Sequence, residues 1–286
     1  MTARRIIGCT EPSYFTTDVI STIEKFFDAN PLKLCQNEVD DLYVWLDMCD
    51  AVILAGGADI HPRLYGCAVL NEYGFSKFDV RRDYRELRII HYCFQKGIPI
   101  LGICRGHQML GVYHNIKLIC DLSDGVLCHQ PAAQKISHNR EEPMHWVCLL
   151  DEAHATFEAC EEGSQILPGS ISAHSRYLWV NSFHHQGLWY LTEAEEKKRQ
   201  KEVGADYKPA KWRRKVEVLG YAAGVKKRRI IELMRGKTND WLSCQWHPEY
   251  DWEQNAASKM ILTRFGELIE KGKAGSLRSK KRRVSK

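Results

Sequence analysis

The sequence predicts an α/β fold of three layers, in which helices cover both faces of a doubly wound, mainly parallel sheet. Apolar runs at residues 4–9, 51–54 and 98–103 predict buried strands, because the strands of a parallel sheet are covered on both faces. Amphipathic segments separate these runs, and an alternation of strand and helix favours right-handed crossovers within one parallel sheet. Residues 216–223 and 229–234 read as paired strands, which predicts a small antiparallel β extension.

The elements between these strands follow from their own patterns. In the helix predicted at residues 17–29, Val19, Ile20 and Ile23 share one face, and a threonine stands at the start as a cap. The remaining elements are expected, in chain order, as strand 32–35, helix 39–48, helix 107–112, strand 116–122, strand 145–150, helix 153–159, strand 241–246 and helix 253–271.

A further helix, predicted at residues 79–95, carries many charges near its start. Its apolar residues face the core, whereas Arg82, Asp83 and Glu86 are expected to point outward. Mixed charges on a helix are typical of a solvated face. The sequence therefore gives these three residues no catalytic role.

Composition is that of a globular protein and argues against several other classes. The chain has 286 residues, of which 44% are hydrophobic and 27% are charged, and its formal net charge is +5. It contains no apolar run of about 18 residues that would span a membrane, and residues 1–8 lack the apolar core of a signal peptide. We therefore expect a cytoplasmic protein whose 11 cysteines are reduced thiols.

A single domain is expected at residues 1–272, because chemically informative segments from distant parts of the chain have to meet. Residues 193–215 form a charged insertion within this domain, and residues 273–286 form a basic tail that is expected to be disordered. Binding of nucleic acid is disfavoured, because no aromatic platform and no known nucleic-acid-binding pattern accompany the basic residues.

Cys104 lies on a turn between Gly102 and Gly106, after a buried strand and before a helix. A nucleophile on such a turn stands clear of the sheet, near the positive end of the helix, and the next backbone N–H can bind an oxyanion. The pattern therefore predicts a reactive thiol. The alternative is a buried structural cysteine at the end of a strand.

A partner for this thiol follows the strand predicted at residues 241–246. A cysteine nucleophile needs a base to take its proton, and the base needs a carboxylate that holds its imidazole in one orientation. Pro248 stiffens the chain between His247 and Glu249, so that the carboxylate can turn back toward the ring. Cys104, His247 and Glu249 are therefore the predicted catalytic triad.

These segments resemble the motifs of the class I glutamine amidotransferase superfamily, whose fold is flavodoxin-like. Two further segments narrow the resemblance to the gamma-glutamyl-gamma-aminobutyrate hydrolase family. The motifs occur in the family's order between Ile6 and Ile269, and they read Ala55-Gly56-Gly57-Ala58-Asp59-Ile60-His61-Pro62, Gly102-Ile103-Cys104-Arg105-Gly106-His107-Gln108, Val180-Asn181-Ser182-Phe183-His184-His185-Gln186-Gly187 and Gln245-Trp246-His247-Pro248-Glu249.

The resemblance implies roles for residues around the triad. The backbone N–H groups of Gly57 and Arg105 would form the oxyanion hole, and the segment with His184 and His185 would hold the glutamyl end of a substrate. Gln108 is a further candidate for substrate contact. A metal site at the paired histidines is not expected, because neighbours on a strand point to opposite faces and no further ligand set surrounds them. No cofactor is expected.

The resemblance also implies a cysteine hydrolase that cleaves γ-glutamyl amide bonds, such as that of γ-glutamyl-GABA, through a thioester. The products would be glutamate and an amine. One alternative is a glutaminase (glutamine amidotransferase) subunit that uses the same triad and delivers ammonia to a partner synthetase. Another is an inactive binding or regulatory protein on the same fold. The expected partners are a small γ-glutamyl substrate and, in a homodimer, a second copy of the chain.

Overall fold

The computed structural model describes residues 4–10, 16–34, 41–66, 78–120, 122, 145–150, 177–203, 210–223 and 229–284. The helix expected at residues 153–159 lies outside them. The described helices are α1 (Thr16–Lys25), α2 (Leu42–Met48), α3 (Val80–Lys96), α4 (Arg105–Tyr113), α6 (Glu193–Val203) and α7 (Ala256–Val284), with short 3₁₀ helices η2 (Pro62–Leu64), η4 (Lys211–Arg214) and η6 (Pro248–Tyr250). The described strands are β1 (Arg5–Thr10), β2 (Ala29–Lys33), β3 (Ala51–Leu54), β4 (Ile100–Ile103), β5 (Leu118–Ile119), β6 (His145–Leu149), β7 (Tyr177–Val180), β8 (Gly187–Tyr190), β9 (Val216–Ala223), β10 (Arg229–Gly236) and β11 (Trp241–Cys244).

These strands form one sheet in the order β2-β1-β3-β4-β11-β10-β9-β6-β7, with β8 paired to β10 and β5 paired to β8. Neighbours from β2 to β11 are parallel, whereas β10 and the strands beyond it pair antiparallel. The predicted α/β fold is confirmed. Its antiparallel extension is larger than the two strands predicted, because the short strands β5 to β8 also join it.

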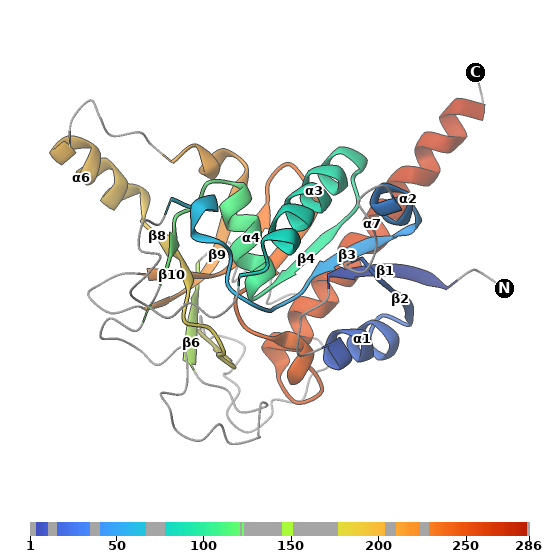
Figure 1. Ribbon diagram of the computed structural model, residues 1–286, viewed down its shortest axis with the longest axis horizontal. Helices are drawn as coiled ribbons and strands as arrows, with labels where there is room; N and C mark the ends of the chain where they lie inside the picture. Colours follow the sequence, from blue (N-terminus) through green and yellow to red (C-terminus); the bar gives the residue numbers. More distant parts are fainter. Residues whose placement is uncertain are drawn as a thin grey trace.

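Helices cover both faces of the parallel part of the sheet (Figure 1). On one face α1 and α7 pack over a core that includes Ile23 and Phe265, and on the other α2, α3 and α4 pack over a core that includes Leu46. In β3, Ile53 belongs to the first core and Leu54 to the second, as the alternation of side chains along a strand requires. Burial on both faces explains why the strand is continuously apolar.

The charged side of α3 is buried, so the prediction of a solvated face is wrong. Arg82, Asp83 and Glu86 are 5%, 0% and 0% exposed. They form ion pairs with one another and with Arg105 at the start of α4. Paired opposite charges tolerate a burial that an isolated charge does not. The sequence shows the charges of α3 but not the partner from α4.

The helix α7 continues into the basic segment that was expected to be disordered. It runs from Ala256 to Val284 and therefore includes residues 273–284. Its earlier turns are anchored by buried Phe265 and Ile269. Extending an anchored helix avoids the cost of nucleation, and Lys, Arg, Leu and Ala are good helix formers. This corrects the prediction of a disordered tail over those residues.

The charged insertion at residues 193–215 contains the helix α6 and the 3₁₀ helix η4. Most described side chains of α6 are exposed, but Glu196 is buried, because its carboxylate accepts a hydrogen bond from Arg213 Nε at 2.8 Å. The contact joins α6 to η4 and so gives the insertion internal order. That residues 1–272 form one domain stays a prediction.

Among the described cysteines, one differs from the prediction. Cys120 is disulfide-bonded. The free thiols in the described part of the chain are Cys9, Cys49, Cys93, Cys104, Cys148 and Cys244. A count of cysteines does not reveal which two sulfurs come together, and this pairing was therefore missed.

Across the described ranges, none of the helices is both long and apolar enough to cross a lipid bilayer.

Candidate active site

The turn after β4 places Cys104 at the carboxyl edge of the parallel strands. Its backbone has φ 50° and ψ −103°, a conformation that costs a non-glycine residue about 1–3 kcal/mol and is concentrated at functional sites. The Cys104 N–H donates to the Cys244 carbonyl at 2.9 Å, and the Cys104 carbonyl accepts from the Gln108 N–H at 3.0 Å. The neighbouring strand and helix thus hold the turn in place, and 7% of the cysteine surface stays exposed.

The glycines on either side of Cys104 are required by close packing. A Cβ at Gly106 would lie 2.0 Å from the Leu54 carbonyl oxygen, and a Cβ at Gly102 would lie 2.9 Å from the backbone of Gly106. The first turn of α4 therefore packs directly against the end of β3. This contact brings the loop that follows β3 beside the nucleophile.

The strand β11 carries the predicted base to the same edge of the sheet. It pairs in parallel with β4, and Cys244 lies opposite Ile103, so the residues that follow both strands emerge together. The His247 Nδ1 atom lies 2.8 Å from Glu249 Oε1, and both side chains are buried. The charge of Cys104 acts on the same ring and raises its pKa. The structure thus brings the three predicted residues together as thiol, imidazole and carboxylate.

Two residues that the sequence did not single out hold His247 in place. Asn181 accepts a hydrogen bond from the His247 N–H at 2.9 Å and donates one to the His247 carbonyl at 2.8 Å. Tyr250 stacks on the imidazole, with ring centroids 4.7 Å apart and planes 3° from parallel. In the sequence, Asn181 stood out only as one residue of the motif at residues 180–187. No sequence signal marked Tyr250.

The surroundings of His247 favour its protonated form. Burial disfavours the cation, but the charges of Glu249 and Cys104 outweigh burial and raise the pKa of His247 from 6.5 to about 10. At neutral pH the ring therefore carries a proton that it can pass to a departing amine.

The loop after β3 lies against the other side of this ring. A Cβ at Gly56 would lie 2.7 Å from His247 Cε1. Gly57 has φ 146°, a value that favours glycine, and Arg105 begins α4, where backbone N–H groups have no partner within the helix. The two predicted donors of an oxyanion hole thus lie on the two segments that flank Cys104 and His247. Their role in catalysis stays a prediction.

Two of the three residues predicted to contact substrate connect the walls of the site. Gln108 is buried, and its amide donates to the Gln186 carbonyl at 3.1 Å and to Gln245 Oε1 at 3.2 Å. His185 Nε2 lies 3.0 Å from Asp59 Oδ2, which joins the segment after β7 to the loop after β3. Gln108 therefore braces the site from inside, whereas the half-buried His185 lies at its border.

His184 points into the interior, which argues against direct contact with a substrate. It is 3% exposed, and its Nε2 lies 3.8 Å from Glu232 Oε1, while His145 Nε2 lies 3.3 Å from Glu232 Oε2. In the described part of the chain these three residues are a set that could hold a metal ion, since their ligand atoms lie within 4.8 Å of one another. The same distances suit a buried cluster of ion pairs. The function proposed below assigns no role to a metal.

Two hollows lined by described residues lie away from the thiol. One, of about 140 Å³, borders Glu249 and Tyr250 on the side of α1. The other, of about 540 Å³, lies between the end of α4 and the insertion, where His114, Trp189 and Trp212 line it. Cys104 lines neither hollow, so they do not define the entrance for a substrate.

Comparison with known proteins decides the family. The family model described as Peptidase C26 matches residues 4–198, which is more than half of the chain. The chain belongs to the Peptidase C26 family. The match includes Cys104 and the loop after β3, whereas His247 and Glu249 lie beyond it. In this Peptidase C26 protein the roles of His247 as base and Glu249 as its carboxylate therefore stay predictions, which the geometry described above supports.

The relatives of this Peptidase C26 protein agree with the predicted superfamily. The glutamine amidotransferase-like protein YvdE of Lactococcus lactis subsp. lactis is 29% identical over 234 residues, which cover 80% of this chain and 78% of that protein. The gamma-glutamyl-gamma-aminobutyrate hydrolase PuuD of Escherichia coli is 27% identical over 222 residues, which cover 77% of this chain and 72% of that protein.

A solved structure has the same fold. A protein from Thermoplasma acidophilum that is named as part of a GMP synthase superposes with a TM-score of 0.56 at 14% identity, and the match covers 96% of this chain and 99% of that one. At this identity the likeness concerns the fold alone. It agrees with the predicted α/β fold of the Peptidase C26 chain.

Asp251, which follows η6, gives a testable dependence of stability on pH. Burial raises the pKa of its carboxyl from 3.8 to about 6, although a hydrogen bond from Asn255 Nδ2 at 2.9 Å opposes the rise. Between these values the native state keeps a proton that the unfolded state releases, so the contribution to stability is present below pH 3.8 and is lost as pH rises through about 6.

Relative to the variant Asp251→Asn, the wild-type free energy of unfolding is expected to fall by about 2–3 kcal/mol between roughly pH 4 and pH 7.5. Urea denaturation of both proteins across this range measures the difference, in which other titrations cancel. A difference that does not vary with pH would contradict the shift.

Proposed function

We propose that this chain is a cysteine hydrolase that cleaves γ-glutamyl amide bonds and releases glutamate and an amine. The proposal is supported above all by the buried His247 ring, which interacts electrostatically with Cys104 and lies 2.8 Å from Glu249 Oε1. This arrangement activates a thiol and also supplies a proton to a leaving group. The 27% sequence identity to a γ-glutamyl-γ-aminobutyrate hydrolase, over most of both chains, supports the γ-glutamyl class of substrate.

The proposed reaction has two steps, and each uses His247. In the first, Cys104 Sγ attacks the carbonyl carbon of the side-chain amide, the C–N bond breaks, and the departing nitrogen takes the proton of the imidazolium. In the second, water gives a proton to the neutral imidazole and attacks the thioester carbon. The C–S bond then breaks, which releases glutamate and regenerates the thiolate and imidazolium. Glu249 keeps the ring oriented and balances its charge throughout.

The negative charge on the carbonyl oxygen would be held by two backbone donors, the N–H groups of Gly57 and Arg105. One such donor is typically worth about 3 kcal/mol of transition-state stabilisation. His185, at the border of the site beside Asp59, would contact the glutamyl group. Gln108 and His184 would not touch the substrate but would hold the segment that carries His185, through their hydrogen bonds to the Gln186 carbonyl.

A glutaminase that serves a partner synthetase is the second candidate function. The observation that favours it is the match to the Thermoplasma acidophilum protein named as part of a GMP synthase, which covers 99% of that chain. Such a glutaminase would use the same triad on glutamine and deliver ammonia to its partner. The narrower family motifs and the similarity to PuuD favour the hydrolase.

The test is a panel of γ-glutamyl amides, with γ-glutamyl-GABA, other γ-glutamyl amines, γ-glutamyl peptides and glutamine, offered to the purified chain. Release of glutamate is measured for each compound. The hydrolase proposal expects turnover of at least one γ-glutamyl amine or peptide without a partner, at a rate well above that for glutamine. Hydrolysis of glutamine alone would favour the ammonia-delivering glutaminase. Inertness toward the whole panel, without labelling of Cys104 by a glutamine-like electrophile, would favour a binding protein.

A further inference from the structure

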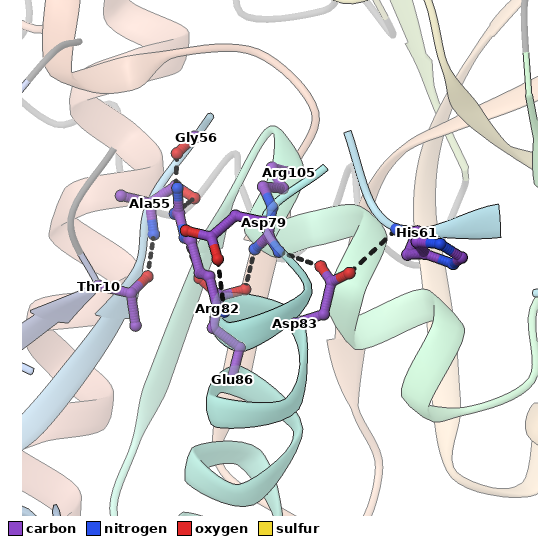
Figure 2. Close-up of polar contacts among 9 residues, drawn as sticks. All are labelled: Thr10, Ala55, Gly56, His61, Asp79, Arg82, Asp83, Glu86 and Arg105. Carbon is purple, nitrogen blue, oxygen red and sulfur yellow. Dashed lines mark hydrogen bonds and ion pairs between the residues drawn. The ribbon is translucent and has the colours of Figure 1, made fainter. Parts of the chain in front are cut away.

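Four buried charges from α3 and α4 form one cluster behind the loop after β3 (Figure 2). Arg82 Nε lies 2.8 Å from Glu86 Oε1, and Arg105 is paired with both Asp83 and Glu86. The cluster holds two positive and two negative side chains and is therefore neutral when all four are ionised. Burial raises the pKa of a carboxyl, but Arg105 and Arg82 outweigh burial at Glu86 and lower its pKa below the ordinary value.

A cluster of this kind is poorly explained by stability alone. Replacing a buried ion pair with well-packed apolar side chains is often neutral or stabilising, because two charges must be taken out of water. The contacts that the cluster makes with the backbone are therefore a better guide to its role than the ion pairs themselves.

Arg82 holds the loop after β3 by its backbone. Its Nη2 atom donates to the carbonyls of Ala55 and Gly56, at 2.9 Å in each case. The guanidinium lies so close to the next residue that a Cβ on Gly57 would be 2.3 Å from Arg82 Nη1. The base of the arginine is itself fixed, because Asp79 caps α3 by accepting from the Arg82 N–H at 3.0 Å.

The hydrogen bond to the Gly56 carbonyl sets the direction of the next N–H. The peptide between Gly56 and Gly57 is trans, so its C=O and N–H point in opposite directions. Because the carbonyl points to Arg82, the Gly57 N–H points away from the guanidinium. The glycines on both sides of this peptide would otherwise allow it to rotate freely.

Arg105 is held by the same cluster from the opposite side. Its guanidinium pairs with Asp83 and Glu86, while its backbone N–H lies directly after Cys104 in the first turn of α4. Asp83 also accepts from the His61 N–H at 3.0 Å, further along the loop after β3. One turn of α3 therefore anchors both peptides that would supply N–H donors to the oxyanion.

We propose that Arg82 is a positioning residue that aims the Gly57 N–H into the oxyanion hole through its hydrogen bond to the Gly56 carbonyl. The proposal rests on the hydrolase function proposed above. It gives the buried charged cluster a purpose, which is to stabilise the transition state of that hydrolysis. Arg82 touches no reacting atom. Its effect is confined to the step in which charge develops on the carbonyl oxygen.

The decisive variant is Arg82→Met, compared with wild type in two reactions of Cys104. Hydrolysis of L-γ-glutamyl-p-nitroanilide or the best amide of the panel passes through an oxyanion, whereas alkylation by iodoacetamide does not. We expect kcat to fall about 100-fold, the typical loss for one misplaced oxyanion donor. KM and the alkylation rate of Cys104 are expected to stay within about threefold of wild type.

Two further variants provide the controls. Arg81→Met removes an exposed arginine from the same turn of α3 and is expected to leave both reactions unchanged. Arg82→Lys keeps the charge and is expected to recover part of the lost kcat. Should Arg82→Met fail to fold, Arg82→Met with Glu86→Gln keeps the cluster neutral and replaces it in the comparison.

An unchanged kcat in Arg82→Met, or an equal loss of hydrolysis and alkylation, would overturn the proposal. Crystal structures of wild type and of the folded methionine variant test the role of Arg82 independently of the proposed hydrolase function. If wild type hydrolyses no amide, the hydrolase function fails, yet the structures still decide the role of Arg82. The proposal requires the peptide between Gly56 and Gly57 to turn in the variant, and an unmoved peptide would refute it.

Discussion

Cys104→Ala is expected to abolish turnover of γ-glutamyl amides, with a loss in kcat of about 10⁵-fold or more. The thioester cannot form without the sulfur, and no other described cysteine follows a strand at the edge where His247 lies. The fold is expected to remain, because the change removes one atom and keeps the Cβ on the turn. The rate of glutamate release and the thermal unfolding midpoint, measured on the same preparation, check both parts.

The matched control for this variant is Cys148→Ala on β6, a free thiol outside the proposed triad. It is expected to keep the wild-type rate. Mass spectrometry after treatment with a glutamine-like electrophile is expected to find the label on Cys104 in wild type and in the control. A residual rate in Cys104→Ala above about one hundredth of wild type would mean that another group attacks the substrate.

His247→Asn is the variant with the second largest expected effect, a loss of about 10⁴-fold in kcat. Asparagine can neither take the thiol proton nor return a proton to the leaving amine. It fills a similar space beside Tyr250, so the site is expected to stay formed. The control is His91→Asn on the exposed side of α3, which is expected to leave the rate unchanged.

The pH dependence of a milder variant tests the same assignment from another side. Glu249 helps to raise the pKa of His247 to about 10, so the wild-type imidazolium persists into alkaline solution. In Glu249→Gln that support is lost, the pKa of His247 falls, and the alkaline decline of kcat/KM is expected at lower pH. Profiles from pH 6 to 11 measure the shift. Coincident declines in the two proteins would show that Glu249 does not act on His247.

The sequence was sufficient to predict that the strands before Cys104 and His247 end at one edge of the sheet, because its signals are local. A buried strand, a glycine turn and a helix place Cys104 without knowledge of any distant contact. The strand before His247 and the carboxylate after it are likewise read within a few residues. Parallel strands end at one edge of a sheet, so both groups could be expected there.

The supporting residues were missed because their environment is not local. Arg82, Asp83 and Glu86 have the composition of a solvated helix face, and only the approach of Arg105 and of the loop after β3 makes their burial favourable. His184 and His185 are neighbours in the motif, yet one points to Glu232 in the interior and the other to Asp59 at the border. The sequence predicts that these two neighbouring side chains point in opposite directions, but it does not show which of them points into the interior.

The pairing of β4 with β11 has a consequence for the protein during its synthesis. The two strands are joined by more than a hundred residues, and contacts across such a separation form late in folding. A nascent chain of which only the first half has left the ribosome already contains the cysteine, but not the histidine that would activate it. The order of synthesis alone therefore keeps an unfinished polypeptide from cleaving amides.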